Sequence, residues 1–392
     1  MNTASDISKE TATSLLTYFS ERRSEMLAFI RKLVELESPS GDETGSRAVV
    51  DLLASALRDI ACVHSIEQIA SPGYGDHLLV RAFSEINNST GTMLVVGHTD
   101  TVHMRGTLEE RPWRIEDNRV YAPGIFDMKA NCAMAVEVLR ACAKLKVRPH
   151  CEIVLLLTCD EETGSDTGRA IIENEARRAA SALVLEPPAT GGRVKTGRKG
   201  TGIFIMDIQG RASHAGLEPE KGVSAILELA RQIERLHAMN DLQNGISVNV
   251  GVVEGGTRSN VVAAHARAEI DLRFSSMDEG REIERLILQS PPFDSGTRVL
   301  VTGGINRPPL ERTDNVLSLY GRAKRVAALL DFELGEAQVG GASDGNFIAA
   351  SGVPVLDGLG IDGDGAHAAH EHILLDDVAR RCALLAGLLL SL

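Results

Sequence analysis

Three short apolar runs, each followed at once by acidic or imidazole side chains, constrain this chain more than any other feature. The runs cover residues 93–96, 153–157 and 182–185. They show no polar alternation, which is typical of strands covered on both faces of a parallel sheet. Between the first two runs, residues 130–145 place Met134, Val138 and Leu145 on one face of a predicted helix. The pattern therefore predicts an α/β fold with a largely parallel central sheet.

A second pattern begins near Gly200, where strand-like runs and helical spacing alternate in the order βαββαβ. The segments are 203–208, 223–236, 247–253, 263–274, 279–288 and 298–301. This order is typical of a ferredoxin-like unit. We therefore expect an α/β domain interrupted by an inserted ferredoxin-like domain. The expected boundaries are 1–198 and 311–392 for the α/β domain and 199–310 for the insertion.

Both ends of the chain show helical spacing, and we expect one helix over residues 14–36 and a closing helix over 376–390. The α/β pattern resumes near Val316 and includes an apolar run at 353–356. The α/β domain should therefore continue after the insertion.

The composition restricts the function class. A net charge of -13 argues against a protein that tracks nucleic-acid phosphates. No apolar run reaches the roughly 18 residues of a membrane span, and residues 1–35 lack the apolar core and cleavage site of a signal peptide. The six cysteines form no C-x-x-C pair, so free thiols in a reducing compartment are expected. These features favour a cytoplasmic protein without nucleic-acid or membrane partners.

Side chains that can bind metal ions lie near the ends of the apolar runs, just before the helix predicted over 130–145, and in a glycine-rich stretch near the C-terminus. They are His98, Asp100, Asp127, Glu161, Glu162, Glu186 and His367. Open α/β sheets place their sites at the carboxyl ends of strands. Two histidines, an aspartate and two glutamates suit a pair of zinc ions with one bridging carboxylate, and a further glutamate could serve as the base. Each residue alone also fits a hydrogen-bonded loop or a solvated turn, but their ordered placement favours a site.

Nine motifs resemble those of the co-catalytic zinc exopeptidases. They are GHTDTV at 97–102, YAPGIFDMK at 121–129, DEETGS at 160–165, LEP at 185–187, GRASHAG at 210–216, GGTRSNV at 255–261, DLR at 271–273, GASD at 341–344 and GAH at 365–367. That family contains glutamate carboxypeptidases, acetylornithine deacetylases, succinyl-diaminopimelate desuccinylases and aminoacylases. The resemblance is strongest to bacterial glutamate carboxypeptidases and covers nearly the whole chain. It implies that the inserted domain is a lid and dimerisation domain.

The resemblance implies roles for the candidate residues of the catalytic domain. One metal ion would be bound by His98 and Glu186, the other by Glu162 and His367, with Asp127 as the bridge. Asp100 would accept the second ring N–H of His98 and fix its tautomer. Glu161 would be the general base, taking a proton from metal-activated water and passing it to the leaving amine. The cofactors would be two divalent ions per subunit, zinc first, with manganese and cobalt as alternatives.

The resemblance also implies three functional residues in the lid. His214 and Asn260 would hold the scissile region or the developing oxyanion. Arg273 would bind the free carboxylate of the substrate through its planar guanidinium. A turn cap for Asn260 and a surface ion pair for Arg273 are the plain alternatives.

The sequence departs from the family pattern at two places. Ala130 stands where many relatives have glycine, and residues 368–371 read AAHE where serine or threonine is commoner. His370 and His372 could therefore compete with His367 for the ligand role. Three further cations fit either a substrate contact or plain solvation: Lys129, Arg198 and Lys199.

These patterns together predict a metal-dependent carboxypeptidase or amidohydrolase. It would release an amino acid with a free carboxylate, preferably glutamate or aspartate, from an acyl or peptidyl group. The alternatives are a deacylase of the acetylornithine or succinyl-diaminopimelate type, an N-acyl-amino-acid aminoacylase, and a hydrolase of an unusual aromatic amine or amide. A catalytically silent binding protein is the non-enzyme alternative, which the intact Glu161 disfavours.

The expected assembly is a homodimer formed through the lids, in which His214 completes the site of the partner subunit. The lid should rotate on substrate binding about hinges near Gly200 and residues 307–309.

Overall fold

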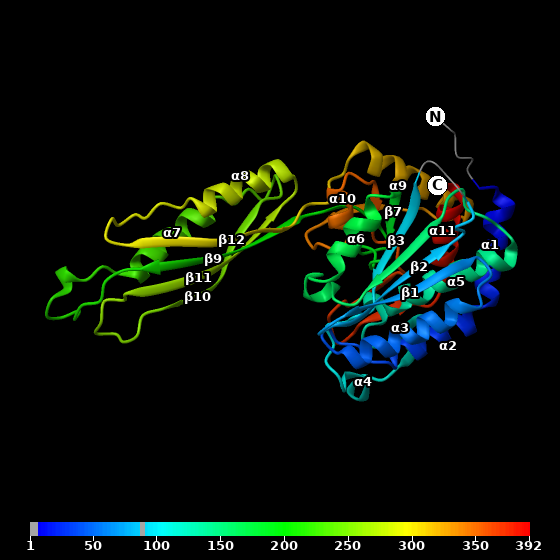
Figure 1. Cartoon of the computed structure of the whole chain (residues 1–392), viewed down its shortest axis with the longest axis horizontal. Helices are drawn as coiled ribbons and strands as arrows, with labels where there is room; N and C mark the ends of the chain where they lie inside the picture. Colours follow the sequence, from blue (N-terminus) through cyan, green and yellow to red (C-terminus); the bar gives the residue numbers. More distant parts are fainter. Residues whose placement is uncertain (1–6, 87–90) are drawn as a thin grey trace. The chain divides into compact units, whose positions relative to one another are not determined.

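The computed structural model describes residues 7–86 and 91–392. The chain forms two compact units (Figure 1). The first comprises Met1–Thr196, Arg312–Gln338 and Ser343–Leu392, and the second comprises Gly197–Glu311 and Val339–Ala342. The first six residues of the chain, which belong to the N-terminal segment discussed above, lie outside the described residues. That the second unit acts as a lid stays a prediction.

The first unit is built on a six-stranded sheet. In spatial order its strands are β1 (Val63–Ser71), β2 (Gly75–Ala82), β6 (Ile153–Thr158), β3 (Thr92–His98), β7 (Ala179–Val184) and β14 (Val355–Leu356). β6, β3, β7 and β14 run parallel, whereas β1 and β2 add an antiparallel edge. The predicted α/β fold with a mostly parallel central sheet is therefore confirmed.

Both faces of the parallel strands are buried, which explains the missing polar alternation. Met93 and Val95 of β3 belong to a large apolar core, and Leu94 and Val96 are equally buried although they point to the opposite face. The helices that contribute to the large core are α1 (Lys9–Glu21), α2 (Arg23–Val34), α3 (Glu43–Arg58), α5 (Ala130–Leu145), α9 (Asp314–Leu329) and α11 (Asp377–Ser391). On the opposite face, α6 (Gly168–Ala176) and α10 (Gly345–Ala350) contact β7.

Smaller elements complete the first unit around the edge of the central sheet. One short sheet has the order β15 (Gly363–Asp364), β16 (His372–Leu374), β5 (Arg119–Tyr121) and β4 (Arg114–Glu116). Three further elements are the pair β8 (Val194–Arg198) and β13 (Glu336–Val339), and the short helix α4 (Thr107–Glu110). The last residues of β8 and β13 already belong to the second unit. His367 lies in the connection from β15 to β16, so this small sheet determines where that histidine is held.

The N-terminal prediction was wrong in one respect. The segment 14–36 is not one helix, because α1 ends and α2 begins at Arg22, whose backbone N–H bonds to the carbonyls of Tyr18 and Ser20. The buried Phe19 and Met26 are seven residues apart, a spacing that fits both a continuous helix and two helices packed on one core. Within the described residues, every helix falls short of the length and apolar character that a membrane crossing requires.

The second unit follows the order strand, helix, strand, strand, helix, strand. Its elements are β9 (Gly200–Gln209), α7 (Ala225–His237), β10 (Ser247–Gly255), β11 (His265–Phe274), α8 (Met277–Leu288) and β12 (Arg298–Arg307). The sheet is antiparallel with the spatial order β10-β11-β9-β12, and one face packs on both helices. Ser224 and Ser276 cap the two helices by accepting backbone N–H groups. The second unit therefore has the predicted ferredoxin-like order of elements and an apolar core of its own.

Candidate active site

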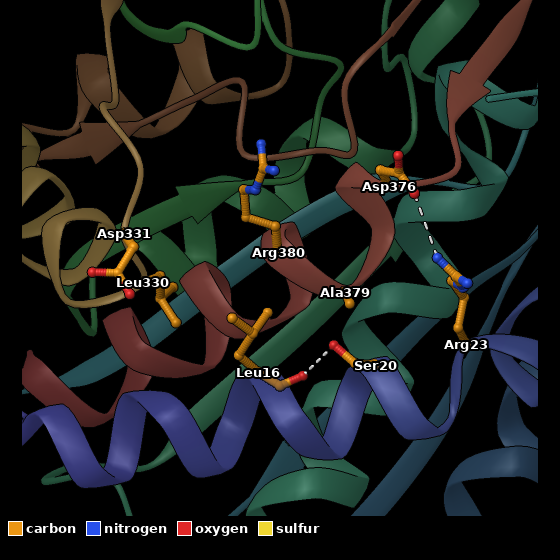
Figure 2. A pocket seen from close by; sticks show the side chains of 8 residues that line it. All are labelled: Leu16, Ser20, Arg23, Leu330, Asp331, Asp376, Ala379 and Arg380. Carbon is orange, nitrogen blue, oxygen red and sulfur yellow. Dashed lines mark hydrogen bonds and ion pairs between the residues drawn. The ribbon is translucent and has the colours of Figure 1, made fainter.

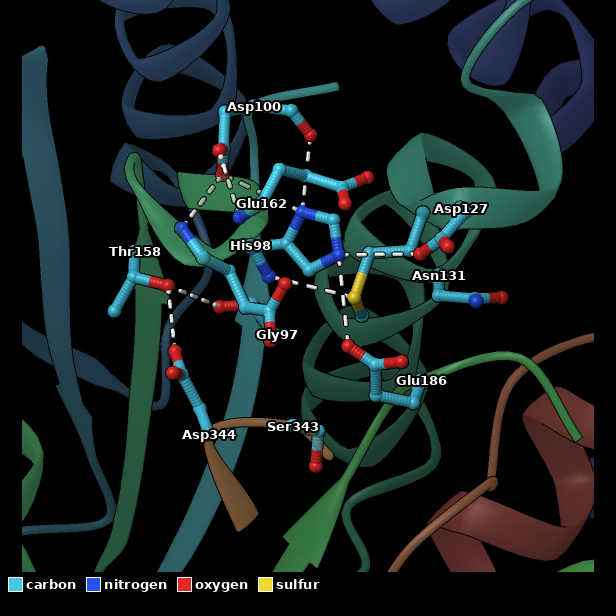
Figure 3. A network of polar contacts seen from close by, with 12 residues as sticks. Gly97, His98, Asp100, Asp127, Asn131, Thr158, Glu162, Glu186, Ser343 and Asp344 are labelled. Carbon is cyan, nitrogen blue, oxygen red and sulfur yellow. Dashed lines mark hydrogen bonds and ion pairs between the residues drawn. The ribbon is translucent and has the colours of Figure 1, made fainter. Parts of the chain in front are cut away.

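Three neighbouring parallel strands deliver candidate residues to one edge of the central sheet. β3 ends at His98, β6 leads into a short turn at Glu161–Thr163, and β7 is followed by Glu186. Because β6, β3 and β7 are adjacent and parallel, their carboxyl ends meet at the same edge. Figure 3 shows the side chains of His98, Glu162 and Glu186 gathered there with Asp127.

His98 lies at the centre of the cluster and is almost fully buried. Its Nε2 is 3.1 Å from Asp127 Oδ1 and 3.5 Å from Glu186 Oε1. Its Nδ1 is 2.9 Å from the backbone carbonyl oxygen of Asp100 and 3.4 Å from Asp100 Oδ1. An Nδ1–H donated to the Asp100 carbonyl leaves the Nε2 lone pair facing the two carboxylates (Figure 3).

His98 contacts the Asp100 carboxylate at 3.4 Å, as expected, but the main-chain carbonyl of Asp100 is the nearer acceptor at 2.9 Å. The carboxylate of Asp100 also accepts from Ser40 Oγ at 2.6 Å and from the amides of Glu161 and Glu162, each at 3.2 Å. Its burial raises the pKa of the carboxyl, but hydrogen bonds, first from His98, outweigh this and lower the pKa. Asp100 thus anchors both the histidine and the turn that carries the two glutamates.

His367 and Glu162 form the opposite side of the cluster. His367 Nε2 is 3.1 Å from Glu162 Oε2 and 3.4 Å from Asp127 Oδ2. The two carboxylate oxygens of Asp127 therefore face two different histidines, His98 through Oδ1 and His367 through Oδ2. The structure brings together the five residues proposed as metal ligands from the sequence.

The adjacent Glu161 and Glu162 both lie close to His98 but in different groups. Ligand atoms of His98, Glu161 and Glu186 lie within 4.8 Å of one another, and the same holds for His98, Asp127 and Glu162. Neighbouring side chains in a tight turn point in different directions, so one glutamate can act as a metal ligand and the other as a base.

The charges of the cluster are arranged to hold a cation. For Asp127, burial raises the pKa, but hydrogen bonds from His367 and His98 outweigh it and lower the pKa. For His98, burial acts to lower the pKa, yet the bonds to Asp100 and Asp127 raise it well above its usual range. Hydrogen bonds to Asp127 and Glu162 raise the pKa of His367 to about 10. Positive charge at the two imidazoles is thus strongly favoured.

One buried oxygen supports a metal ion over a proton as the intended cation. Glu162 Oε1 is buried and has no hydrogen-bond partner among the described residues. A buried carboxylate oxygen without a partner is costly and calls for an explanation. The cluster also combines imidazole nitrogen and carboxylate oxygen donors, which suit zinc and related divalent ions. The residues present therefore fit a metal site.

The cations that the sequence left open have structural contacts. Lys129 is fully buried and its Nζ donates to the carbonyl of Leu36 at 2.5 Å, so it is neither solvated nor turned outward. Burial lowers the pKa of Lys129 to about 8. Arg198, in the second unit, is also buried and donates from Nη1 to the carbonyls of Gly341 and Ala342. Lys199 is half-buried.

The three predicted lid residues all belong to the second unit. His214 pairs with Val261 in an isolated bridge, and the amide of Ala215 donates to the carbonyl of Asn260 at 2.9 Å. The loops of His214 and Asn260 are therefore neighbours. Nδ1 of His214 accepts the amides of Gly216 and Leu217, which leaves Nε2 as the nitrogen directed away from its own loop.

Arg273 lies on β11 and forms an ion pair two residues away. Its Nε is 2.9 Å from Asp271 Oδ1, and its Nη2 donates to Asp271 Oδ2 at 2.9 Å. Both side chains are more than a third exposed. Such a pair adds little to stability but restricts the direction of the guanidinium.

The competing histidines do not join the cluster. His370 is exposed, and His372 is buried with its Nδ1 2.9 Å from the carbonyl of His370 and its ring near Tyr121. The Nε2 atom of His367, in contrast, is 3.4 Å from Asp127 Oδ2 and 3.1 Å from Glu162 Oε2. His367 is thus the histidine of this segment that lies beside Asp127.

Sequence reasoning missed the buried polar residues that support the cluster. Asp344 accepts from Thr158 Oγ1 at 2.9 Å (Figure 3). It also accepts from Ser165 Oγ, so its two bonds bracket the turn of Glu161 and Glu162. Glu371 accepts backbone amides near Asp127. Asp344 belongs to the GASD motif, which was noted without a role. Nothing in the local pattern marks Glu371 apart from its position four residues after His367.

A surface hollow of about 300 Å³ lies elsewhere on the first unit, among α1, the end of α9 and the start of α11 (Figure 2). Its lining residues are Leu16, Ser20, Arg23, Leu330, Asp331, Asp376, Ala379 and Arg380. Arg23 is 3.5 Å from Asp376, and Asp331 is 2.8 Å from Lys9. These charges already have partners, and the hollow shares no residue with the cluster around His98.

Comparison with known proteins decides the family. The model of Peptidase family M20/M25/M40 matches residues 94–391. The chain belongs to this family. The match covers most of the chain, including the five clustered residues from His98 to His367. The resemblance inferred from the motifs is confirmed, and the M20 chain is a hydrolase of the metallopeptidase type.

Individual relatives agree with this assignment. Carboxypeptidase G2 of Pseudomonas sp. (strain RS-16) is 29% identical over 371 residues, which cover 93% of this chain and 88% of that protein. A succinyl-diaminopimelate desuccinylase of Thioalkalivibrio sulfidiphilus is 28% identical over 363 residues, covering 84% of this chain and 93% of that protein. The crystal structure of aminopeptidase PepT from Bacillus cereus matches with a TM-score of 0.77 at 22% identity, covering 94% of this chain and 98% of that chain. The last similarity concerns the M20 fold.

Proposed function

We propose that this M20 hydrolase holds two divalent metal ions and cleaves an amide bond, releasing an amino acid with a free carboxylate from an acyl or peptidyl group. One observation carries the proposal: the two carboxylate oxygens of Asp127 face two different histidines, His98 and His367. A carboxylate placed between two imidazoles would be suited to bind two divalent ions at once.

The proposed ligand set follows the contacts of the cluster. His98 and Glu186 would hold one ion and Glu162 and His367 the other, with Asp127 shared between them. Zinc suits this set best, with manganese and cobalt as alternatives. When bound, the ions supply a Lewis acid for the scissile carbonyl and lower the pKa of a water molecule to about 7.

Glu161 is the proposed general base. Its position beside His98 and Glu186, on a turn whose amide is held by Asp100, supports this role. It would take a proton from the attacking water and pass it to the nitrogen of the leaving amino acid, so that one carboxylate serves both steps. Glu162, whose Oε2 already contacts His367, is then the ligand.

The proposed substrate carries a carboxylate next to the scissile nitrogen. Arg273 supports this, because a guanidinium binds a carboxylate through two parallel N–H bonds, and Asp271 restricts its direction. The similarity to Carboxypeptidase G2 over 93% of this chain also favours it. Glutamate or aspartate is the preferred leaving amino acid.

A second candidate function is the removal of a short acyl group from an amino acid, as in a deacylase. The desuccinylase relative, similar over 84% of this chain, favours it. The chemistry at the amide bond would be the same, and the two candidates differ in whether the acyl part is small or large.

The test is a release assay with matched substrates. Benzoyl-, peptidyl-, acetyl- and succinyl-amides of glutamate, aspartate, ornithine and diaminopimelate would be supplied to protein loaded with zinc, manganese or cobalt. Release of glutamate or aspartate from the large acyl groups is expected. A preference for the succinyl or acetyl compounds would support the second candidate, and no release by any loaded form would contradict both.

We propose that the protein is a cytoplasmic homodimer joined through the second unit. The free, buried state of all six cysteines supports a reducing compartment. Strand β10 supports the dimer, because it is an edge strand of the sheet and exposes Val252 and Val253. A second copy of the chain that pairs along β10 would cover both valines. Val253→Lys should then convert the dimer into a monomer in light-scattering measurements.

A further inference from the structure

We propose that Glu371 is a positioning residue that sets the direction of the Asp127 carboxylate and thereby the affinity of the metal pair. Glu371 is 2% exposed and belongs to the segment that follows His367. Its carboxylate accepts three backbone amides, those of Gly124 at 2.8 Å, Phe126 at 2.9 Å and Asp127 at 3.0 Å. All three lie in the turn that carries Asp127.

These bonds join the two segments that face each other across the cluster. Asp127 lies in the turn before α5, and His367 lies in the connection from β15 to β16. The side chains of these two residues are 3.4 Å apart at Oδ2 and Nε2. Glu371 lies four residues after His367, and its carboxylate accepts the backbone amide of Asp127. The position of the Asp127 carboxylate relative to His367 thus depends on the buried side chain of Glu371.

Glu371 is itself held by His103. His103 Nε2 is 2.5 Å from Glu371 Oε2, and its Nδ1 is 3.4 Å from Arg111 Nη2. Arginine only donates, so Nδ1 must accept and Nε2–H must donate to Glu371. Arg111 also donates from Nη1 to the carbonyl of Ala368, next to His367. Arg111, His103 and Glu371 therefore form a chain of bonds that ends on the amide of Asp127.

The arrangement has a consequence for metal binding. A bridging carboxylate must present its two oxygens in two different directions, and a rotated backbone at Asp127 would move both at once. Outer residues that orient metal ligands usually change affinity by about 10- to 100-fold when they are replaced. We therefore expect Glu371 to affect the binding of the second ion most, because that ion depends on the bridge being in place. The inference rests on the two-ion site proposed above.

The test is metal binding by Glu371→Gln. Glutamine has one acceptor oxygen, so it can keep the bonds to Phe126 and Asp127 but presents an NH₂ group to the Gly124 amide and to His103. Metal-free protein would be titrated with zinc and with cobalt by calorimetry, and the visible spectrum of the cobalt form would be recorded. The expected result is about 10- to 100-fold weaker binding of the second ion, with altered cobalt bands.

Glu228→Gln is the matched control. Glu228 is also a buried carboxylate that accepts two backbone amides, those of Phe293 and Asp294, but it lies in the core of the second unit. It should lose comparable thermal stability and keep both metal affinities. If Glu371→Gln binds both ions as tightly as this control, the inference is overturned while the two-ion site stands. If the wild-type protein binds only one ion, the proposed site fails and the inference fails with it.

His103 provides a second route if Glu371→Gln does not fold. His103→Ala removes the donor to Glu371 and leaves the three amide bonds in place, so binding of the second ion should weaken. His103→Gln supplies an N–H group in a similar position and should restore part of the affinity. Equal affinities in wild type, His103→Ala and His103→Gln would contradict the role of this chain of bonds.

Discussion

Two adjacent glutamates in one turn occupy different positions around His98, and this suggests a division between base and ligand. Glu161 is grouped with His98 and Glu186, whereas Glu162 contacts His367. Glu161→Gln should therefore lower kcat by about 100-fold or more, the usual scale for general acid–base catalysis, and retain the metal.

The control for this prediction is Glu162→Gln, which should lose metal as well as activity. Metal content would be measured by atomic absorption on protein passed through a desalting column. Loss of metal from Glu161→Gln, together with retention in Glu162→Gln, would exchange the two roles.

The protonation of His367 predicts how metal binding depends on pH. Hydrogen bonds to Asp127 and Glu162 raise the pKa of His367 to about 10 in the metal-free protein. Below that pH the imidazole carries a proton that an ion must displace, so metal affinity should rise as the pH increases from 7 toward 10. Calorimetric titrations in buffers of different ionisation enthalpy would show the proton release.

His367→Ala lacks both this proton and a proposed ligand, so it should bind the second ion weakly and take up the remaining ion without the proton that His367 releases. Affinity that does not change between pH 7 and pH 9 in the wild-type protein would contradict the prediction.

At the level of elements, the turn before α5 determines the position of Asp127. Gly124 has a φ of 69°, and a Cβ added there would lie 2.5 Å from Thr101 Cγ2. Gly124→Ala should therefore destabilise the protein by about 1–2 kcal/mol through backbone strain alone, with a further cost from the clash. Metal affinity should fall because the turn must shift.

Gly73→Ala separates strain from displacement of the turn. Gly73 has a φ of 87°, but an added Cβ would meet no atom within 4 Å. The Gly73→Ala protein should be less stable because of strain in the backbone, but its metal affinity should stay unchanged. Chemical denaturation and zinc titration of both variants would be compared, and equal metal affinities would show that the Gly124 turn does not position the site.

For the whole molecule, the decisive prediction concerns His214 and the dimer. Glu161→Ala and His214→Ala proteins, each inactive alone, would be mixed and allowed to exchange subunits. If His214 completes the partner's site, the mixed dimer contains one site with both lesions and one intact site, so up to half of the wild-type activity per mixed dimer should return.

If His214 acts within its own subunit, each site of the mixed dimer carries one lesion and activity stays absent. Subunit exchange would be verified with differently labelled proteins. A monomer that is fully active at working concentration would contradict the shared site.

Much of the fold was accessible from local patterns. The uninterrupted apolar runs at 93–96 and 153–157 identified β3 and β6. A strand buried on both faces is apolar at successive positions and does not alternate with polar residues. The helix at 130–145 coincides with α5. The antiparallel edge β1 and β2 was not predicted, since β1 has mostly exposed or half-buried side chains and no clear apolar period. The break at Arg22 was hidden because the apolar spacing continues across it.

The sequence by itself determined the sheet type, the family and the candidate residues around His98, because each depends on residue types at fixed places along the chain. Only the tertiary structure decided the contacts that join distant segments. Lys129 bonds to Leu36, and Glu371 holds the turn of Asp127 across 244 residues. Such bonds form between groups with no sequence relation to each other. They depend on which loops the packed sheet and helices bring within hydrogen-bond distance.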